Sequence, residues 1–160
     1  MFLLIKEEKF KEFNEQLRTP TKEEKAIIFS ETNSDDLTLL QFAIMNGQWA
    51  IDYLLNAGAD PNIKSEKTNL TCLSLALYFD SPRVVKSLLK HGAKYYEGLL
   101  MTALIFSDNE CFKLLLELVN DIEELKKVYE RALNTNNAGK KIKLLGARIK
   151  MLEKVKEYLD

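Results

Sequence analysis

Side chains able to perform catalysis or bind metals are few in this sequence, and they lie far apart. The 160 residues contain a single histidine, His91, and two cysteines, Cys72 and Cys111. An active or metal site needs several such groups together, for example a nucleophile with its base or a set of His, Cys and carboxylate ligands. The six glycines are too dispersed to form a phosphate-binding loop. We therefore expect no catalytic residue, no metal and no cofactor; an enzyme is an alternative without support.

Each of these three residues has a simpler structural interpretation. His91 directly precedes Gly92 at the expected end of a helix, where a solvated imidazole would interact with the partial negative charge of the helix. Cys72 and Cys111 lie within apolar helical patterns, in which a thiol behaves as a small hydrophobic side chain. We expect no disulfide between them, because this context is typical of a reducing compartment.

Basic residues are concentrated near the C-terminus. Residues 138–160 hold seven Lys or Arg against three acidic side chains, interspersed with apolar positions. This pattern is typical of the solvated face of an amphipathic helix, although a docking site for an acidic partner or for nucleic acid would also contain it. The net charge of −1 provides no global attraction for polyanions, so we expect no nucleic-acid partner.

Membrane insertion and secretion are not predicted. Residues 1–5 are apolar but too short for the hydrophobic part of a signal peptide, and no window reaches the 18 or more apolar residues that a spanning helix needs. We expect no membrane partner and a cytoplasmic location. The composition, 46% hydrophobic and 29% charged with three prolines, indicates one helix-rich globular domain over residues 1–160.

The sequence contains internal repeats, which determine where these residues lie in the fold. Thr38–Ala43 and Thr71–Ala76 share a threonine, a leucine and an alanine at an offset of 33, and residues 54–60 match residues 88–94 at an offset of 34. A third copy follows in register if Gly98 replaces the threonine, with an offset of 27 from the second copy. Self-similarity at such a period is the signature of a repeat protein.

These repeats resemble the ankyrin repeat, whose pattern is Thr-Pro-Leu-His-x-Ala, a glycine, paired leucines and then Gly-Ala-Asp-x-Asn. Gly58–Asn62 is the strongest single match, and the similarity is clear over residues 33–121. The resemblance implies an all-α ankyrin-repeat solenoid of three to four helix-pair repeats with helical caps. Residues 1–32 would form the N-terminal cap, and residues 122–160 a degenerate fourth repeat or C-terminal cap.

Local signals place the helices within this scheme. We expect helix pairs at 39–57, 72–91 and 99–119. The N-terminal end should contain a helix at 8–18 and a second one after Thr21, and the C-terminal end should contain helices at 122–134 and 140–159. Their boundaries rest on capping boxes at Thr21-x-x-Glu24 and Ser107-x-x-Glu110, on Ser81–Pro82 and on Gly92.

The chain departs from the family pattern in two ways. The histidine that the family uses to bridge repeats is replaced by Gln41, Ser74 and Met101, of which the first two could partly substitute for it. The link from Gly92 to Gly98 is also short, so one projecting hairpin should be missing.

The resemblance implies binding of a partner protein, which the sequence does not identify, in a concave groove lined by the first helix of each repeat and by the hairpins. The positions that correspond to this groove are Leu37, Met45, Asn46, Leu70, Tyr78, Phe79, Ile105 and Phe106. Exposed aromatic residues there would mark a binding site, but large apolar side chains are more often core. We expect a monomeric scaffold, inhibitor or immunity-type protein, with a bacterial effector acting in the host cytosol as the alternative.

Overall fold

The computed structural model describes residues 1–135 and 138–159 as two compact units. The first contains residues 1–76 and 83–94, and the second contains residues 77–82 and 95–160. Within the described residues the regular structure is helical, apart from one isolated β-bridge between Thr32 and Thr38. The all-α prediction is confirmed, whereas the assignment of residues 1–160 to one domain stays a prediction.

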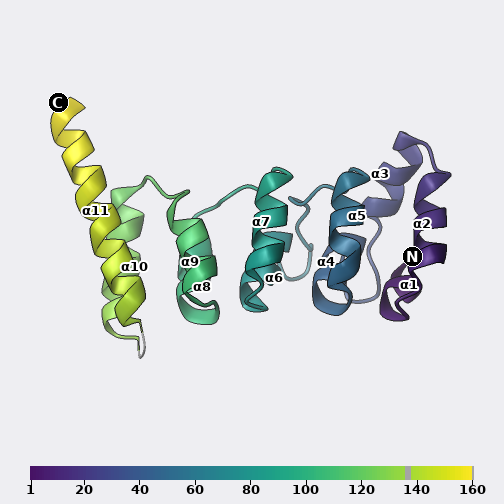
Figure 1. The fold of residues 1–160 in the computed structure, drawn as a ribbon, viewed down its shortest axis with the longest axis horizontal. Coiled ribbons are helices and arrows are strands. Elements are labelled where there is room, and N and C mark those ends of the chain that lie inside the picture. Colours follow the sequence, from purple (N-terminus) through teal and green to yellow (C-terminus); the bar gives the residue numbers. More distant parts are fainter. Residues whose placement is uncertain (136–137, 160) are drawn as a thin grey trace. The chain divides into compact units, whose positions relative to one another are not determined.

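Helices of the first unit follow the predicted order (Figure 1). Their apolar faces enclose a core that includes Ile5, Phe13, Phe29, Leu40, Leu54 and Leu88. The helices at the N-terminal end and the first two helix pairs were predicted, whereas the short α1 was not. The elements are α1 (Phe2–Lys6), α2 (Phe10–Arg18), α3 (Lys22–Ser30), α4 (Leu39–Asn46), the 3₁₀ helix η1 (Gln48–Ala50), α5 (Ile51–Asn56), α6 (Cys72–Tyr78) except its last two residues, and α7 (Pro82–Lys90) from Arg83 onward.

Capping boxes begin two of these helices. The Thr21 hydroxyl accepts a hydrogen bond from the Glu24 backbone N–H, and the Glu24 carboxylate accepts one from the Thr21 N–H. Thr38 and Gln41 form the same reciprocal pair at the start of α4. Each box satisfies two backbone N–H groups that would otherwise have no partner at a helix start. The prediction at Thr21 is confirmed.

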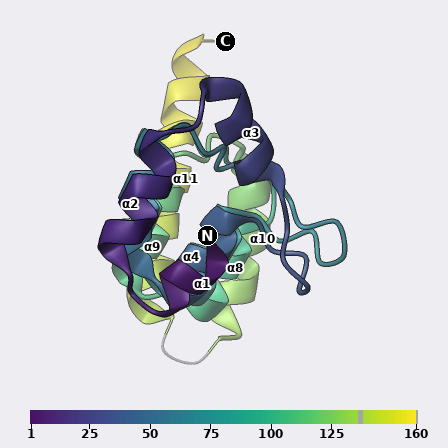
Figure 2. The ribbon, with the colours of Figure 1, turned by 90° about the vertical axis from the view of Figure 1, so that its right-hand side faces the viewer.

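Two loops, residues 31–38 and 62–71, project from the same side of the first unit (Figure 2). Oδ2 of Asp36 in the first loop accepts hydrogen bonds from Oγ of Ser65, at 2.6 Å, and from the backbone N–H of Lys67, at 2.7 Å. Nε2 of Gln41 donates to the carbonyls of Ile63, at 3.3 Å, and Leu70, at 2.8 Å. Gln41 therefore substitutes for the missing bridging histidine, as predicted.

His91 is half-buried, less solvated than predicted, but its predicted interaction with the negative end of the helix is present. Its Nδ1 lies 2.8 Å from the carbonyl of Ser87 in the last turn of α7, and its Nε2 lies 3.2 Å from Oδ1 of Asn56 at the end of α5. The ring thus joins the ends of two neighbouring helices. Gly92 follows with φ 86°, the left-handed conformation predicted for this helix end.

The second unit contains α8 (Leu99–Phe106), α9 (Asn109–Leu116), α10 (Ile122–Leu133) and α11 (Gly139–Leu159). In this unit α10 packs against α8 and α11, and α11 also packs against α9. These helices confirm the predicted third helix pair and both predicted C-terminal helices. The predicted break between the last two includes residues 136–137, which lie outside the described residues.

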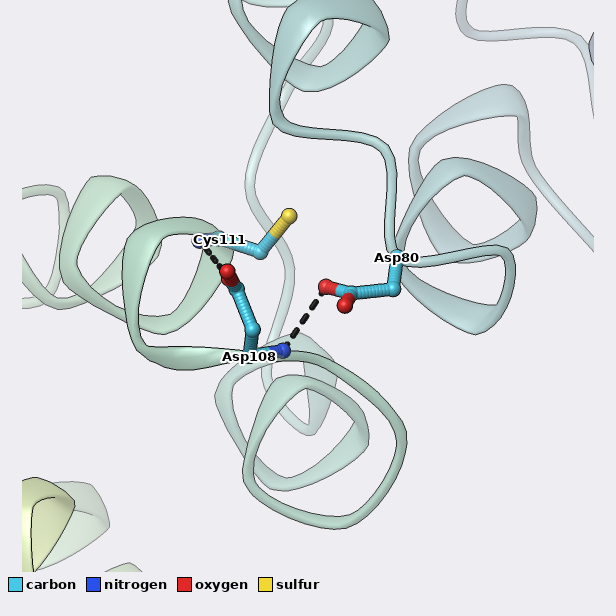
Figure 3. A group of neighbouring side chains, drawn as sticks. All are labelled: Asp80, Asp108 and Cys111. Atoms are coloured by element: carbon cyan, nitrogen blue, oxygen red, sulfur yellow. Dashed lines mark hydrogen bonds between the residues drawn. The ribbon is translucent and has the colours of Figure 1, made fainter.

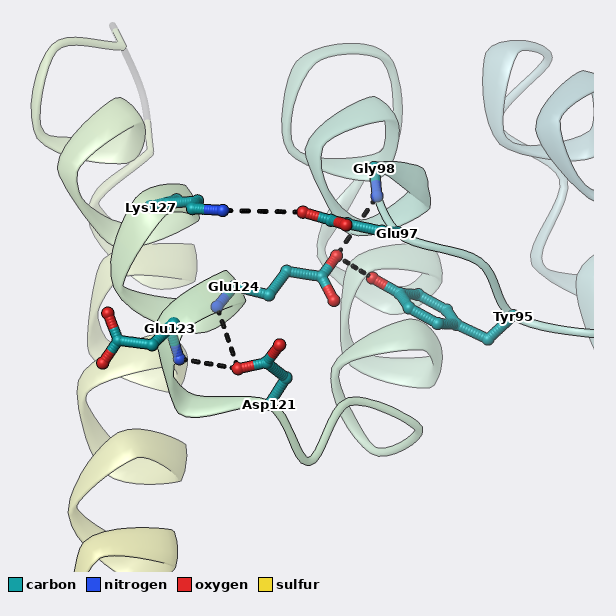
Figure 4. A network of polar contacts seen from close by, with 7 residues as sticks. All are labelled: Tyr95, Glu97, Gly98, Asp121, Glu123, Glu124 and Lys127. Atoms are coloured by element: carbon teal, nitrogen blue, oxygen red, sulfur yellow. Dashed lines mark hydrogen bonds and ion pairs between the residues drawn. The ribbon is translucent and has the colours of Figure 1, made fainter.

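A buried glutamate holds the short link before α8 (Figure 4). The Glu124 carboxylate accepts hydrogen bonds from the Tyr95 hydroxyl and from the Gly98 backbone N–H, while Lys127 lies 3.6 Å from Glu97. Burial, together with the negative charge of Glu124, raises the pKa of the Tyr95 phenol. No hairpin projects from this link, as predicted, and contacts with α10 hold the link instead. In the part of the chain that the structure describes, no helix is long and apolar enough to cross a bilayer.

Candidate partner-binding surface

Four apolar side chains of the second unit form an exposed patch, here named the aromatic surface: Tyr78, Phe79, Ile105 and Phe106. Their exposed fractions are 58%, 41%, 50% and 50%, respectively. The alternative that these side chains belong to the core is therefore wrong. Large apolar side chains are normally withdrawn from water, so a group of four exposed together is typical of an interaction site.

The rings contact one another. The ring centroids of Tyr78 and Phe79 are 5.4 Å apart with an interplanar angle of 86°, and those of Tyr78 and Phe106 are 5.2 Å apart at 48°. Edge-to-face and tilted pairs at such distances are favourable arrangements of aromatic rings. Tyr78 thus joins the aromatic residues at the ends of α6 and α8 into one patch.

Two hydrogen bonds between turns hold these rings together. Oγ of Ser107 donates to the carbonyl of Leu77 at 2.7 Å, and the backbone N–H of Asp108 donates to Oδ1 of Asp80 at 2.7 Å. Asp80 has φ 47°, a left-handed conformation that aspartate tolerates better than most residues and that turns the chain directly after Phe79. The residues that follow α6 and α8 therefore fix the positions of the rings at the ends of these helices.

The capping box predicted at Ser107 is wrong. The N-cap of α9 is Asp108, whose carboxylate accepts hydrogen bonds from the backbone N–H groups of Glu110 and Cys111. Because Asp108 supplies the cap, the Ser107 hydroxyl is free to donate to Leu77.

Lys141 of α11 stabilises the turn that follows α8. It is buried, and its Nζ donates to three carbonyls at the end of α8, those of Ala103 at 3.1 Å, Leu104 at 2.9 Å and Ser107 at 2.5 Å. The ammonium group opposes the partial negative charge at the helix end and is a second donor to the Ala103 carbonyl, which also accepts the backbone N–H of Ser107. Burial lowers the pKa of Lys141, and the nearby carboxylates of Asp108 and Asp80 partly offset that effect.

Arg148, about two helical turns further along α11, has a similar structural role. Its guanidinium donates to the carbonyls of Glu117 and Val119, beyond the end of α9, and to Oδ1 of Asn120 at 3.0 Å. The prediction that all seven C-terminal basic residues form a solvated face is therefore wrong for Lys141 and Arg148. The roles of Lys141 and Arg148 could not be predicted from the sequence, because their acceptors lie 28 to 38 residues away.

The other predicted binding residues belong to the first unit and differ in exposure. Leu37 is only 8% exposed and Leu70 is half-buried, so both offer little area to a partner. Met45 and Asn46 are exposed at the end of α4, where the Asn46 amide donates to the carbonyl of Phe42. We retain Met45 and Asn46 as candidates and exclude Leu37, because a buried side chain contributes packing instead of contact area.

One cluster in the second unit resembles a set of metal ligands (Figure 3). Asp80, Asp108 and Cys111 each place one ligand atom within 4.8 Å of the others. Both carboxylates already accept backbone hydrogen bonds, and burial together with the negative charges raises the pKa of the Cys111 thiol to about 12. In this setting the Cys111 thiol is therefore protonated. We assign this cluster a structural role in holding the turns.

One known protein family matches more than half of the chain. A family model described as ankyrin repeats (3 copies) matches residues 4–98. The matched region begins within the segment predicted as an N-terminal cap and ends at Gly98, where the third predicted copy begins. No curated protein matches the sequence.

Proposed function

The chain belongs to the ankyrin-repeat family, and we propose that it binds a partner protein through the aromatic surface. Ankyrin repeats are generally protein–protein interaction modules, and the family is typically non-enzymatic. The observation that carries the proposal is the joint exposure of Tyr78, Phe79, Ile105 and Phe106. A surface of this kind suits a scaffold or an inhibitor, which acts by occupying its partner.

The geometry of the rings favours affinity. Because Tyr78 contacts both phenylalanine rings, and hydrogen bonds hold the turns beneath them, the side chains lose little further freedom when a partner binds. Aromatic residues fixed in this way are common binding hot spots. The partner should therefore present an apolar side chain or a short apolar segment to the rings.

Affinity capture from lysate with quantitative mass spectrometry tests this proposal. We would compare the wild type with Phe79→Ala and Phe106→Ala, using Leu133→Ala as a matched control, since Leu133 is an exposed apolar residue of α10. A true partner is captured by the wild type and the control but is depleted with both phenylalanine variants. With the purified partner, each truncation should weaken binding by about 2 kcal/mol, or roughly 30-fold in Kd. Equal capture by all four proteins would contradict the proposal.

A further inference from the structure

The exposed face of α3 is acidic around one apolar side chain. Glu23, Ile27 and Glu31 follow at four-residue spacing, which places them on one side of the helix, and Glu24 lies three residues before Ile27. All four are exposed, Ile27 to 62%. Ile27 also lines a hollow of about 540 Å³ together with Thr19, Pro20, Glu24 and Ile28. We name Glu23, Glu24, Ile27 and Glu31 the α3 face.

The exposed face of α11 has the opposite charge around a longer apolar stripe. Ala147, Met151 and Val155 follow at four-residue spacing, and Lys150 and Lys154 are exposed beside them. Met151 and Val155 are 53% and 47% exposed. These five residues and Tyr158 line a hollow of about 510 Å³. We name these six residues the α11 face.

We propose that this protein associates head to tail with a second copy of itself, the α11 face of one molecule docking on the α3 face of the next. The two faces are complementary in charge, since lysines border one and glutamates the other. Ile27 lies at the centre of the α3 face, and Ala147, Met151 and Val155 form the centre of the α11 face. A net charge of −1 gives the copies little mutual repulsion. The contact joins two different faces, so it can extend to chains of more than two molecules.

A second copy accounts for both faces at once. An anionic membrane or a nucleic acid would engage the lysines of α11, but it would repel the glutamates of α3. An acidic protein partner would likewise leave Ile27 and the glutamates of the α3 face without a contact. Both faces are small compared with a standard stable interface, so the association should depend on concentration and weaken with salt. It departs from the monomer expected from the sequence.

Sedimentation velocity of the full chain tests the proposal. The weight-average mass of the wild type should rise with protein concentration and fall when salt is added. Two charge-reversed proteins then test the faces: one carries Glu23→Lys with Glu31→Lys, and the other carries Lys150→Glu with Lys154→Glu. All four positions are exposed, so circular dichroism should show both variants folded.

Each variant alone should be monomeric, because its α3 and α11 faces now have the same charge. An equimolar mixture of the two should associate again, because the basic α3 face of one variant meets the acidic α11 face of the other, and their unaltered faces also match. Phe106→Ala, which alters the aromatic surface only, should associate like the wild type. A monomeric wild type at all concentrations, unchanged association of either variant, or a mixture that stays monomeric would each overturn the proposal.

Discussion

The hydroxyl of Ser107 donates a hydrogen bond of 2.7 Å to the carbonyl of Leu77. Both groups are buried, and the bond joins the residue after α8 to the last turn of α6. It therefore fixes the distance between the ends of these helices, where Phe106 and Tyr78 place their rings 5.2 Å apart. A buried side-chain hydrogen bond thus determines the form of an exposed surface.

Removing that hydroxyl should destabilise the protein. Ser107→Ala removes one of two donors to the buried Leu77 carbonyl, which also accepts the backbone N–H of Asp80, and should lower the free energy of unfolding by about 0.5–1.5 kcal/mol. Urea denaturation measures the change. Ser30→Ala is the matched control, because the Ser30 hydroxyl donates to a carbonyl in an exposed setting. Equal stability of the two variants would show that the Leu77 carbonyl does not depend on Ser107.

Truncating the exposed phenylalanines should have little effect on folding. Phe79→Ala and Phe106→Ala should each change the free energy of unfolding by less than about 1.5 kcal/mol, because half of each side chain already contacts water. Phe112→Ala, at a fully buried position of α9, should cost about 3–5 kcal/mol. Thermal unfolding of the three variants separates these cases. Losses as large as that of Phe112→Ala would place the two rings in the core and remove them from the binding surface.

The buried ammonium group should be needed for stability. Lys141→Met removes the donor to three carbonyls at the end of α8 and should lower the free energy of unfolding by about 2 kcal/mol. The neighbouring residue Lys140 is exposed, so Lys140→Met should change stability by no more than about 0.5 kcal/mol. Chemical denaturation of both variants provides the measurement. If Lys141→Met were as stable as the wild type, the cost of desolvating the ammonium group would equal the stabilisation from its hydrogen bonds.

Acid should weaken the contact between the two loops of the first unit. The backbone N–H of Lys67 and the hydroxyl of Ser65 hold the pKa of Asp36 below its usual value. The unfolded chain therefore binds this proton at a higher pH than the folded protein does, so the stabilisation is present above about pH 4 and is lost as pH falls through the folded-state pKa.

Asp36→Asn should reduce this acid dependence. Its free energy of unfolding should be lower than that of the wild type at pH 7, and it should fall less as the pH is lowered below about 4. Denaturation across a pH series checks this, with Asp35→Asn as the control at an exposed neighbouring position. The same acid dependence in Asp36→Asn and the wild type would exclude Asp36 as the group responsible.

Helix positions could be predicted from the sequence because their signals are local. The capping residues Thr21 and Thr38, the proline that begins α7 and the glycine that ends it each act on backbone groups within a few residues. Gln41 could also be predicted, because its place within the repeat fixes which neighbouring loop it reaches. Local chemistry and the repeat period together determined the helix pairs and their order.

Tertiary structure decided the rest, because burial depends on residues distant in sequence. Phe112 and Phe106 have the same side chain and lie in consecutive helices. Phe112 is buried because α9 packs against α8 and α11, whereas Phe106 is exposed. Lys141 and Lys140 are likewise adjacent, but only Lys141 reaches the carbonyls that end α8. Sequence patterns identify which residues share a helix face, whereas the free energy of each side chain is set by what the fold places against it.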